Sequence, residues 1–195
     1  MKVGKYLTKI TDINKLYIEN AISEGDVVVD ATMGNGYDTK YLAEKVGDVG
    51  FVYSFDIQEA AIKSTRKKLE KSNLINRVNL ILDGHENMDK YVKEEVSCVL
   101  FNLGYLPRAD HNVITKPNTT IKAIEHSLKL LKPHGIISIA IYTGHEGGME
   151  EKNSVYDFVK NLDQNEFNVL ESGFINQINN PPQLILIEKK KELEK

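Results

Sequence analysis

Acidic or amide side chains follow four short apolar runs of this chain, and these residues are the first candidates for chemistry. The runs end at Asp30, Asp56, Asp83 and Asn102. A carboxylate gains nothing from lying beside a core, so packing does not explain the repetition. The carboxyl ends of parallel strands meet at one edge of a sheet, where ligands bind. We therefore expect these four side chains to border one ligand site.

A glycine-rich turn follows the first of these acids. Gly34 and Gly36 lie between a predicted strand and a predicted helix, where glycine lets the backbone approach a ligand and point its amides at it. A dinucleotide site would have a third glycine three residues after Gly36, and Thr39 stands there instead. Asp30 would repel a pyrophosphate but suits an ammonium group, such as the amino end of S-adenosylmethionine (SAM). Asp56 can accept both ribose hydroxyls of either ligand, so the pattern favours SAM over NAD.

The sequence after the fourth apolar run carries the most specific chemistry. Asn102-Leu103-Gly104-Tyr105 resembles the Asn-Pro-Pro-Tyr loop of class I methyltransferases that modify nitrogen atoms, with the asparagine and the tyrosine at the same separation. An amide oxygen can accept the N–H bonds of a nitrogen nucleophile, and an aromatic ring can cover its apolar side. Catalysis would then be mostly positioning, because the sulfonium is already activated. The alternative is a turn at the end of a strand, with a bend at Gly104 and a packed tyrosine.

Further polar clusters are predicted at the same edge. Asp83-Gly84-His85 would lie beside an adenine ring, although a polar turn bent at Gly84 explains these residues equally well. Other residues at this edge are candidate contacts for the substrate: Arg108, Tyr142, His145 and Asn180.

Strand and helix patterns alternate along the chain and predict the elements that position these residues. The expected strands cover residues 27–29, 51–55, 78–82, 98–101, 136–141, 167–174 and 184–188. The expected helices cover residues 37–46, 60–69, 88–93, 121–131 and 155–162. This order predicts an α/β fold: a Rossmann-like, seven-stranded, mostly parallel sheet with helices on both faces and a C-terminal antiparallel hairpin. Residues 1–195 are expected to form a single domain.

Composition limits the classes of function. The chain has 195 residues, of which 41% are hydrophobic, and its net charge is −3. Proteins that hold long nucleic acids are usually basic, so a nucleic-acid substrate would have to be gripped locally. We find no apolar run long enough for a membrane span and no metal-ligand spacing among the histidines. The single cysteine, Cys98, is interpreted as a core residue. We expect a cytoplasmic protein without a metal.

Several motifs together make the chain similar to the small bacterial MnmM-type methyltransferases, a family formerly described as rRNA methylases. The motifs are residues 30–36 with Asp38 and Thr39, and residues 55–58, 85–87, 101–107, 142–148 and 179–182. The match extends from about Gly25 to Glu188. The resemblance implies SAM as cofactor and the tRNA anticodon loop as partner. The implied reaction methylates the amino nitrogen of 5-aminomethyluridine at the wobble position and gives 5-methylaminomethyluridine.

The residues and the resemblance together assign a candidate site. Asn102 and Tyr105 are the predicted catalytic residues. The predicted cofactor-binding residues are Asp30, Met33, Gly34, Asn35, Gly36, Asp38, Thr39, Asp56, Gln58, Gly84, His85 and Asn102. The predicted substrate-binding residues are Tyr105, Arg108, Tyr142, His145 and Asn180. The substrate ammonium must lose a proton before it reacts, and Asn102 cannot accept it. Tyr142 and His145 are both candidates for that role.

Other functions stay open from the sequence. The same cofactor could serve methylation of rRNA, of another nucleobase, or of a small-molecule or protein amine. A non-catalytic module that binds a nucleotide is disfavoured by Asp30 and by the missing third glycine. The oligomeric state is also open, with a homodimer among the arrangements considered.

Overall fold

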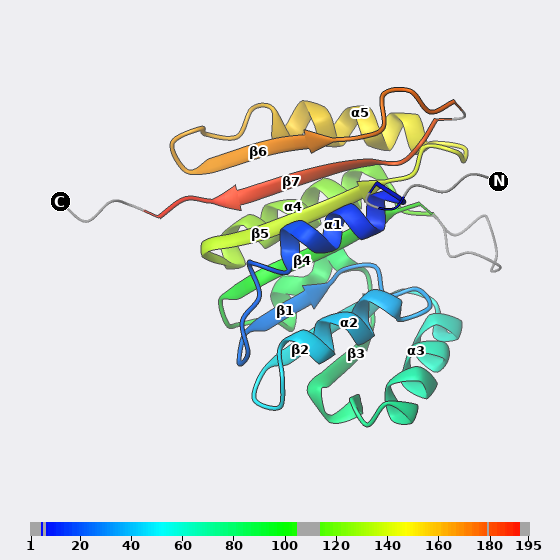
Figure 1. The fold of residues 1–195 in the computed structure, drawn as a ribbon, viewed down its shortest axis with the longest axis vertical. Helices are drawn as coiled ribbons and strands as arrows, with labels where there is room; N and C mark the ends of the chain where they lie inside the picture. Colours follow the sequence, from blue (N-terminus) through cyan, green and yellow to red (C-terminus); the bar gives the residue numbers. More distant parts are fainter. Residues whose placement is uncertain (1–4, 6, 105–113, 179, 192–195) are drawn as a thin grey trace.

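The computed structural model describes residues 5, 7–104, 114–178 and 180–191, and Figure 1 shows their fold. Within these residues, seven strands form one sheet in the order β3-β2-β1-β4-β5-β7-β6. The strands are β1 (Val27–Asp30), β2 (Phe51–Asp56), β3 (Val78–Leu82), β4 (Val96–Leu103), β5 (Leu131–Ile141), β6 (Phe167–Ser172) and β7 (Gln183–Lys189). Strands β1 to β5 pair in parallel, whereas β7 runs antiparallel to both β5 and β6. The predicted sheet and its terminal hairpin are confirmed.

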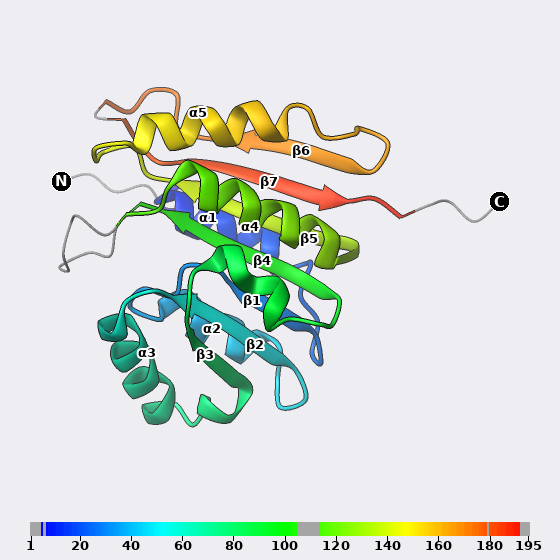
Figure 2. The same cartoon turned by 180° about the vertical axis from the view of Figure 1, so that it is seen from behind.

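Helices cover both faces of this sheet, as predicted. The α-helices are α1 (Ile10–Ile18), α2 (Tyr37–Lys45), α3 (Glu59–Lys71), α4 (Pro117–Leu130) and α5 (Gly148–Val159), and the 3-10 helices are η1 (Ile75–Arg77) and η2 (His85–Lys90). One face packs against α1, α2 and α3, and the other packs against η2, α4 and α5. Figures 1 and 2 show these two layers from opposite sides, with α1 and α2 in front in the first view and α4 and α5 in front in the second.

Coverage of both faces explains why the central strands read as continuous apolar runs. Val28 packs with Leu42 on one side of the sheet, and Val29 packs with Phe101 and other residues on the opposite side. Both valines have an exposed fraction of 0%. Full burial of such a side chain contributes roughly 1.5–3 kcal/mol. Cys98 pairs with Val28 in the sheet and is equally buried, which confirms its interpretation as a core residue.

The first helix, α1, was not predicted. Its buried residues Ile10, Asn14 and Ile18 recur every four positions, so only one narrow stripe faces the sheet. The helix packs on β5 and β7, where the Ser138 hydroxyl donates a 2.6 Å hydrogen bond to Oδ1 of Asn14. A polar residue in the middle of the stripe hid the helical pattern in the sequence.

Several predicted boundaries were wrong, and three of the predicted starts differ from the structure by four residues or more. Helix α4 begins at Pro117 rather than at 121, because proline occupies its first turn, where the missing N–H is not needed. Strand β5 begins at Leu131 rather than at 136, and Leu131 pairs with Val96 across an irregularity in the ladder. Helix α5 begins at Gly148 rather than at 155, because its polar first turn lacks the apolar spacing that signals a helix.

In the sheet, β2 lies next to β1 on one side and β4 lies next to β1 on the other. The direction of strand addition therefore reverses between β1 and β4, which is the topological switch point. Ligands bind at such a switch, beyond the carboxyl ends of the strands. In Figure 1 the carboxyl ends of β1, β4 and β5 point to the same side of the molecule.

Candidate active site

A cavity of about 950 Å³ lies at the carboxyl ends of β1, β2, β4 and β5. This volume is at the upper end of the range of small-molecule sites, roughly 300–1,000 Å³, and is enough for a nucleoside cofactor with part of a substrate. Both polar and apolar side chains form its wall. Four carboxylates contribute to this wall: Asp38, Asp56, Asp83 and Glu86. The cavity therefore suits ligands that carry positive charge.

Most predicted site residues lie in this wall. They are Met33, Gly34, Asn35, Asp38, Asp56, Gln58, Gly84, His85, Asn102, Tyr142, His145 and Asn180. The wall does not include Asp30, Gly36 or Thr39. Tyr105 and Arg108 lie outside the described residues.

Asp30 is buried behind the glycine turn, and here the geometry differs from the predicted direct contact with a cofactor. Its Oδ2 accepts a 2.6 Å hydrogen bond from the Thr39 hydroxyl, which also lies 2.9 Å from the Ser54 hydroxyl. Its Oδ1 accepts the N–H of Thr32 at 3.2 Å. Burial, with the negative charge of Asp38 as the next cause, raises the pKa of Asp30 to about 7. Because the first turn of α2 covers this carboxylate, Asp30 and Thr39 shape the turn rather than the cavity surface.

Asp56 does reach the cavity, at the end of β2. The N–H of Gly34 donates to its Oδ2 and the N–H of Gln58 to its Oδ1, both at 2.9 Å. Burial raises the pKa of this carboxyl, while the hydrogen bonds from Gln58 and Gly34 lower it. A carboxylate oxygen can accept more than one hydrogen bond, so both oxygens keep capacity for the hydroxyls of a ribose.

Gly36 has to be glycine for two reasons. Its φ is +73°, a left-handed conformation that costs other L-residues roughly 1–2 kcal/mol. A Cβ atom there would also lie 2.4 Å from Oγ1 of Thr65 on α3. The same hydroxyl donates to the carbonyl of Gly34 at 3.2 Å. Close packing between α3 and the turn thus fixes the backbone that faces the cavity.

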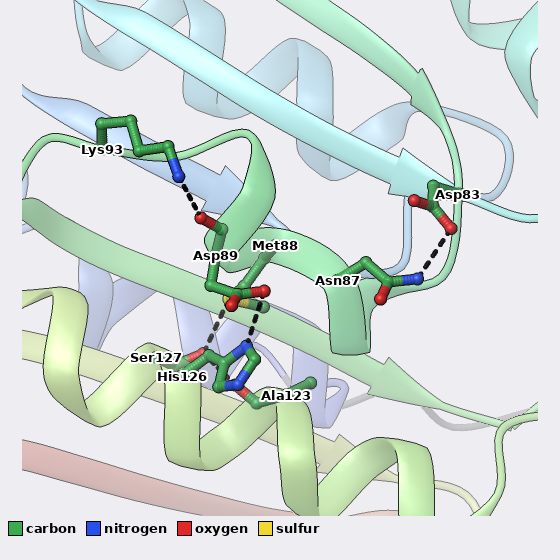
Figure 3. Close-up of polar contacts among 8 residues, drawn as sticks. All are labelled: Asp83, Asn87, Met88, Asp89, Lys93, Ala123, His126 and Ser127. Carbon is green, nitrogen blue, oxygen red and sulfur yellow. Dashed lines mark hydrogen bonds and ion pairs between the residues drawn. The ribbon is translucent and has the colours of Figure 1, made fainter.

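His85 and Asp83 form the wall beyond β3. Nδ1 of His85 lies 3.2 Å from the carbonyl oxygen of Ala31, and burial lowers the pKa of the ring. The neutral ring therefore donates from Nδ1. Burial alone would raise the pKa of Asp83, but hydrogen bonds from Asn87, Tyr91 and the Gly84 N–H lower it. Figure 3 shows the bond from Asn87, which is 2.9 Å long.

Helix η2, which contains His85, contacts α4 through polar side chains. Nδ1 of His126 lies 3.2 Å from Oδ1 of Asp89, and the Ser127 hydroxyl lies 3.4 Å from the sulfur of Met88. Figure 3 shows both contacts. Lys93 also donates to the carbonyl of Asp89 at 2.6 Å. This side of the cavity is thus a wall whose position depends on α4.

Asn102 lies at the end of β4 with its amide orientation fixed. Its Nδ2 donates a 2.9 Å hydrogen bond to Oδ2 of Asp38 on α2. Its backbone N–H donates to the Thr32 hydroxyl at 2.7 Å. Because the amide nitrogen is engaged by Asp38, the amide oxygen is available to accept an N–H bond from a ligand in the cavity.

Tyr142 and His145 lie near Gly104, two residues after Asn102. A Cβ atom at Gly104 would be 3.4 Å from Cβ of Tyr142 and 3.7 Å from Cε1 of His145. Burial, and secondarily the charge of Asp38, raises the pKa of Tyr142. Its phenol therefore stays protonated near neutral pH. Of the two candidates for accepting a proton, His145 is the one whose neutral side chain has a ring nitrogen that can accept it.

The predicted site residues do not include those at the start of α4. Thr115, Lys116 and Thr119 all line the cavity. The Thr115 hydroxyl accepts the N–H of Gly104 at 3.0 Å. Proline after Lys116 is the signal that could have identified these residues, because it marks a helix that begins at the ligand edge.

Two observations bear on other classes of site. Among residues whose positions are described, no group of three or more His, Cys, Asp and Glu side chains is arranged to hold a metal ion. In the same part of the chain, no helix combines the length and the apolar character needed to span a membrane.

The cavity fits SAM by the chemistry of its walls. The backbone turn at Gly34 would lie along the methionine part, Asp56 would hold the ribose, and His85 would lie by the adenine. Asp38 is the carboxylate of the first turn of α2 that reaches the cavity, so it, rather than the buried Asp30, would face the amino group of a bound SAM.

Comparison with known proteins agrees with this fold and with a SAM cofactor. Residues 52–188 match the family model described as "Putative rRNA methylase". A "putative rRNA-methylase" of Clostridium thermocellum superposes with a TM-score of 0.91 at 50% identity, covering 97% of this chain and 100% of that one. A methyltransferase of Streptococcus mutans in complex with SAH superposes at 0.85 and 41% identity, covering 96% and 99%. The "tRNA (mnm(5)s(2)U34)-methyltransferase, chloroplastic" of Arabidopsis thaliana is 40% identical over 164 residues, or 79% of this chain.

The fold, the cavity and the relative with SAH bound define the class: this is a SAM-dependent methyltransferase of class I. More narrowly, the chain belongs to the family whose description is "Putative rRNA methylase". The chain spans 60% of the length of the plant relative.

Proposed function

We propose that this enzyme methylates the amino nitrogen of 5-aminomethyluridine at the tRNA wobble position and gives 5-methylaminomethyluridine. The observation that carries the proposal is the Asn102–Asp38 hydrogen bond, which leaves the Asn102 oxygen to accept an N–H bond in the cavity. That arrangement suits a nitrogen nucleophile. The name of the plant relative, a tRNA methyltransferase acting at U34, supports the choice of nucleoside.

Positioning is the main contribution of the protein in this mechanism. Bound SAM supplies a methyl group that its sulfonium already activates. Asn102 accepts one N–H of the substrate amine and thereby aims the nitrogen lone pair at the methyl. Asp38 keeps the Asn102 amide in the orientation that this requires. Holding two reactants in line contributes far more than any single hydrogen bond.

The amine arrives mostly protonated at neutral pH, so one proton has to leave before attack. We assign its acceptance to His145, because the raised pKa of Tyr142 keeps that phenol protonated. The carboxylates in the wall favour the entry of the cation. The proton then passes from the amine nitrogen to the imidazole, and the neutral amine attacks.

The partner in this proposal is the tRNA anticodon loop, with the wobble nucleoside turned into the cavity. A net charge of −3 suits a protein that grips a short single-stranded loop through local contacts. Tyr105 and Arg108, outside the described residues, stay predictions for contacts to that loop. The single domain, the cytoplasmic location and the homodimer also stay predictions.

The deciding experiment compares two tRNAs in a methyl-transfer assay, one with 5-aminomethyluridine at the wobble position and one with unmodified uridine there. We expect product only from the first, identified as 5-methylaminomethyluridine by mass spectrometry of the digested nucleosides. Equal methylation of both tRNAs would contradict an amine acceptor. Methyl transfer to ribosomal RNA and not to either tRNA would identify rRNA as the substrate, in line with the description of the family.

A further inference from the structure

Glu151 is a buried carboxylate that the proposed mechanism does not use. It lies in the first turn of α5, directly after the turn that contains His145, and its exposed fraction is 1%. Its Oε2 accepts a hydrogen bond from the Thr115 hydroxyl and its Oε1 accepts one from the Thr120 hydroxyl, each 2.6 Å long. The carboxylate thus joins the start of α5 to the start of α4.

Stability alone gives a poor reason for a carboxylate at this place. Within the described residues, no Lys, Arg or His forms a salt bridge with Glu151. Two neutral hydroxyl groups offset only part of the cost of taking a carboxyl group out of water. Apolar residues of similar volume are often neutral or better for stability at buried charged positions. A buried carboxylate with these partners therefore points to a role in the site.

The contact from Glu151 continues to the strand that carries Asn102. The Thr115 hydroxyl, which donates to Glu151, accepts the N–H of Gly104 at 3.0 Å. In return, the N–H of Thr115 donates to the carbonyl of Gly104 at 3.1 Å. Gly104 has a φ of +153°, which side-chain-bearing residues rarely adopt. Two reciprocal bonds thus hold the backbone just beyond Asn102 in an unusual conformation.

The direction of the Thr115 hydroxyl decides whether this arrangement holds. A hydroxyl has one hydrogen, and a carboxylate accepts but cannot donate. Glu151 therefore forces the Thr115 hydrogen toward itself and leaves the oxygen lone pairs for the Gly104 N–H. Thr120 has the same bond to Glu151 but is fully buried and does not line the cavity.

We propose that Glu151 is a positioning residue for the methyl acceptor: it orients the Thr115 hydroxyl, which fixes Gly104 and the end of β4 beside Asn102. The proposal rests on the proposed function for the identity of the acceptor. The cofactor half of the cavity is held by other contacts, so Glu151 acts on the acceptor and leaves SAM affinity unchanged.

Matched threonine variants test this proposal. Thr115→Val removes the hydroxyl that bridges to Gly104, Thr115→Ser keeps it, and Thr120→Val removes the other hydroxyl bound to Glu151. We expect Thr115→Val and Glu151→Gln to lower kcat on aminomethyl tRNA by roughly tenfold to a hundredfold, as loss of alignment does. Thr115→Ser should restore most of the rate. Thr120→Val should stay within about threefold of the wild type, and calorimetry should give all variants a SAM Kd within about twofold.

The variants should also show that the two residues act through one contact. Glu151→Gln combined with Thr115→Val should be no slower than the slower single variant, because both remove the same support. A multiplicative loss in the double variant would overturn the proposal. So would an equal loss in Thr120→Val and Thr115→Val, or a fall in SAM affinity that matches the fall in rate.

Hydrogen exchange separates this proposal from the choice of substrate. If the wild type fails on aminomethyl tRNA, the proposed function fails, but the exchange rates of the Gly104 and Thr115 amides still report on the support by Glu151. We expect both amides to exchange at least about tenfold faster in Glu151→Gln than in the wild type, with no change in the Thr120→Val control. Unchanged exchange in Glu151→Gln would overturn the proposal.

Discussion

The two halves of the cavity are built in different ways. In the cofactor half, backbone amides hold the carboxylate that faces the ribose: the N–H groups of Gly34, 22 positions away, and of Gln58, two positions away, both donate to Asp56. In the acceptor half, side chains far apart in sequence hold each other, as Asn102 and Asp38 do across 64 positions and Thr115 and Glu151 do across 36. We infer that the cofactor half depends on the backbone of the glycine turn and its packing against α3, whereas the acceptor half depends on side-chain contacts that form when α2, α4 and α5 dock on the sheet.

The largest expected effect is in the acceptor half. Asn102→Ala should lower kcat by about a hundredfold or more, because it removes the group that aims the amine. The side chain is half-buried at the end of its strand, so the fold should survive. SAM affinity should fall by less than about threefold. Methyl transfer to aminomethyl tRNA and calorimetry with SAM measure the two quantities.

Asn79→Ala is the matched control for that variant. Asn79 is exposed on β3, away from the cavity, and its loss should change neither rate nor affinity. If Asn102→Ala kept full activity, the proposal that Asn102 orients the substrate amine would be wrong.

The next effect concerns Asp30, which supports the cofactor half from behind. Its pKa in the folded protein is about 7 against an ordinary 3.8, so ionisation destabilises the fold as pH rises between these values. The difference amounts to roughly 4 kcal/mol at 1.36 kcal/mol for each pKa unit. Asp30→Asn removes the ionisation. Its stability relative to the wild type should therefore increase from pH 4 to pH 8, as measured by urea unfolding.

Asp83→Asn is the comparison variant for this dependence of stability on pH. Hydrogen bonds outweigh burial and lower the pKa of Asp83 in the folded protein. The ionised carboxylate therefore contributes its full stabilisation at any pH above the ordinary aspartate pKa. That stabilisation is lost only as pH falls through the pKa of the folded state. The difference between Asp83→Asn and the wild type should be constant above about pH 5. A constant difference for Asp30→Asn as well would show that Asp30 is not buried as described.

A smaller effect is expected on SAM itself. Asp56→Ala should weaken SAM binding by about tenfold or more, because hydrogen bonds to a charged group are worth roughly 1.5–3 kcal/mol. Calorimetry measures the Kd, and Asp157→Ala, an exposed carboxylate on α5, should leave it unchanged. If Asp56→Ala binds SAM normally, the ribose does not lie at the end of β2.

The same contrast decides how much of the site could be predicted. Strand ends and glycine turns are local patterns, so Asp56, Gly34 and His85 could be assigned to the cavity from the sequence. The burial of Asp30 could not, because it depends on Thr39 and Ser54 closing over the carboxylate. Thr115 and Glu151 also escaped prediction. Their contact appears only when α4 and α5 dock, and the polar first turn of α5 gave no helical signal.

The smallest expected effect tests the choice between the two proton acceptors. The Tyr142 ring packs with residues of α1, β5 and β7, and Tyr142→Phe keeps this packing while removing the hydroxyl. A phenol whose pKa lies above its ordinary value of 10 is protonated near pH 7 and cannot take the proton of the amine. Turnover of Tyr142→Phe should therefore stay within about threefold of the wild type, whereas His145→Gln should lose about a hundredfold, the scale of general base catalysis. Single-turnover methyl transfer at saturating SAM separates this step from cofactor binding. A Tyr142→Phe enzyme as slow as His145→Gln would move the role of base to the tyrosine.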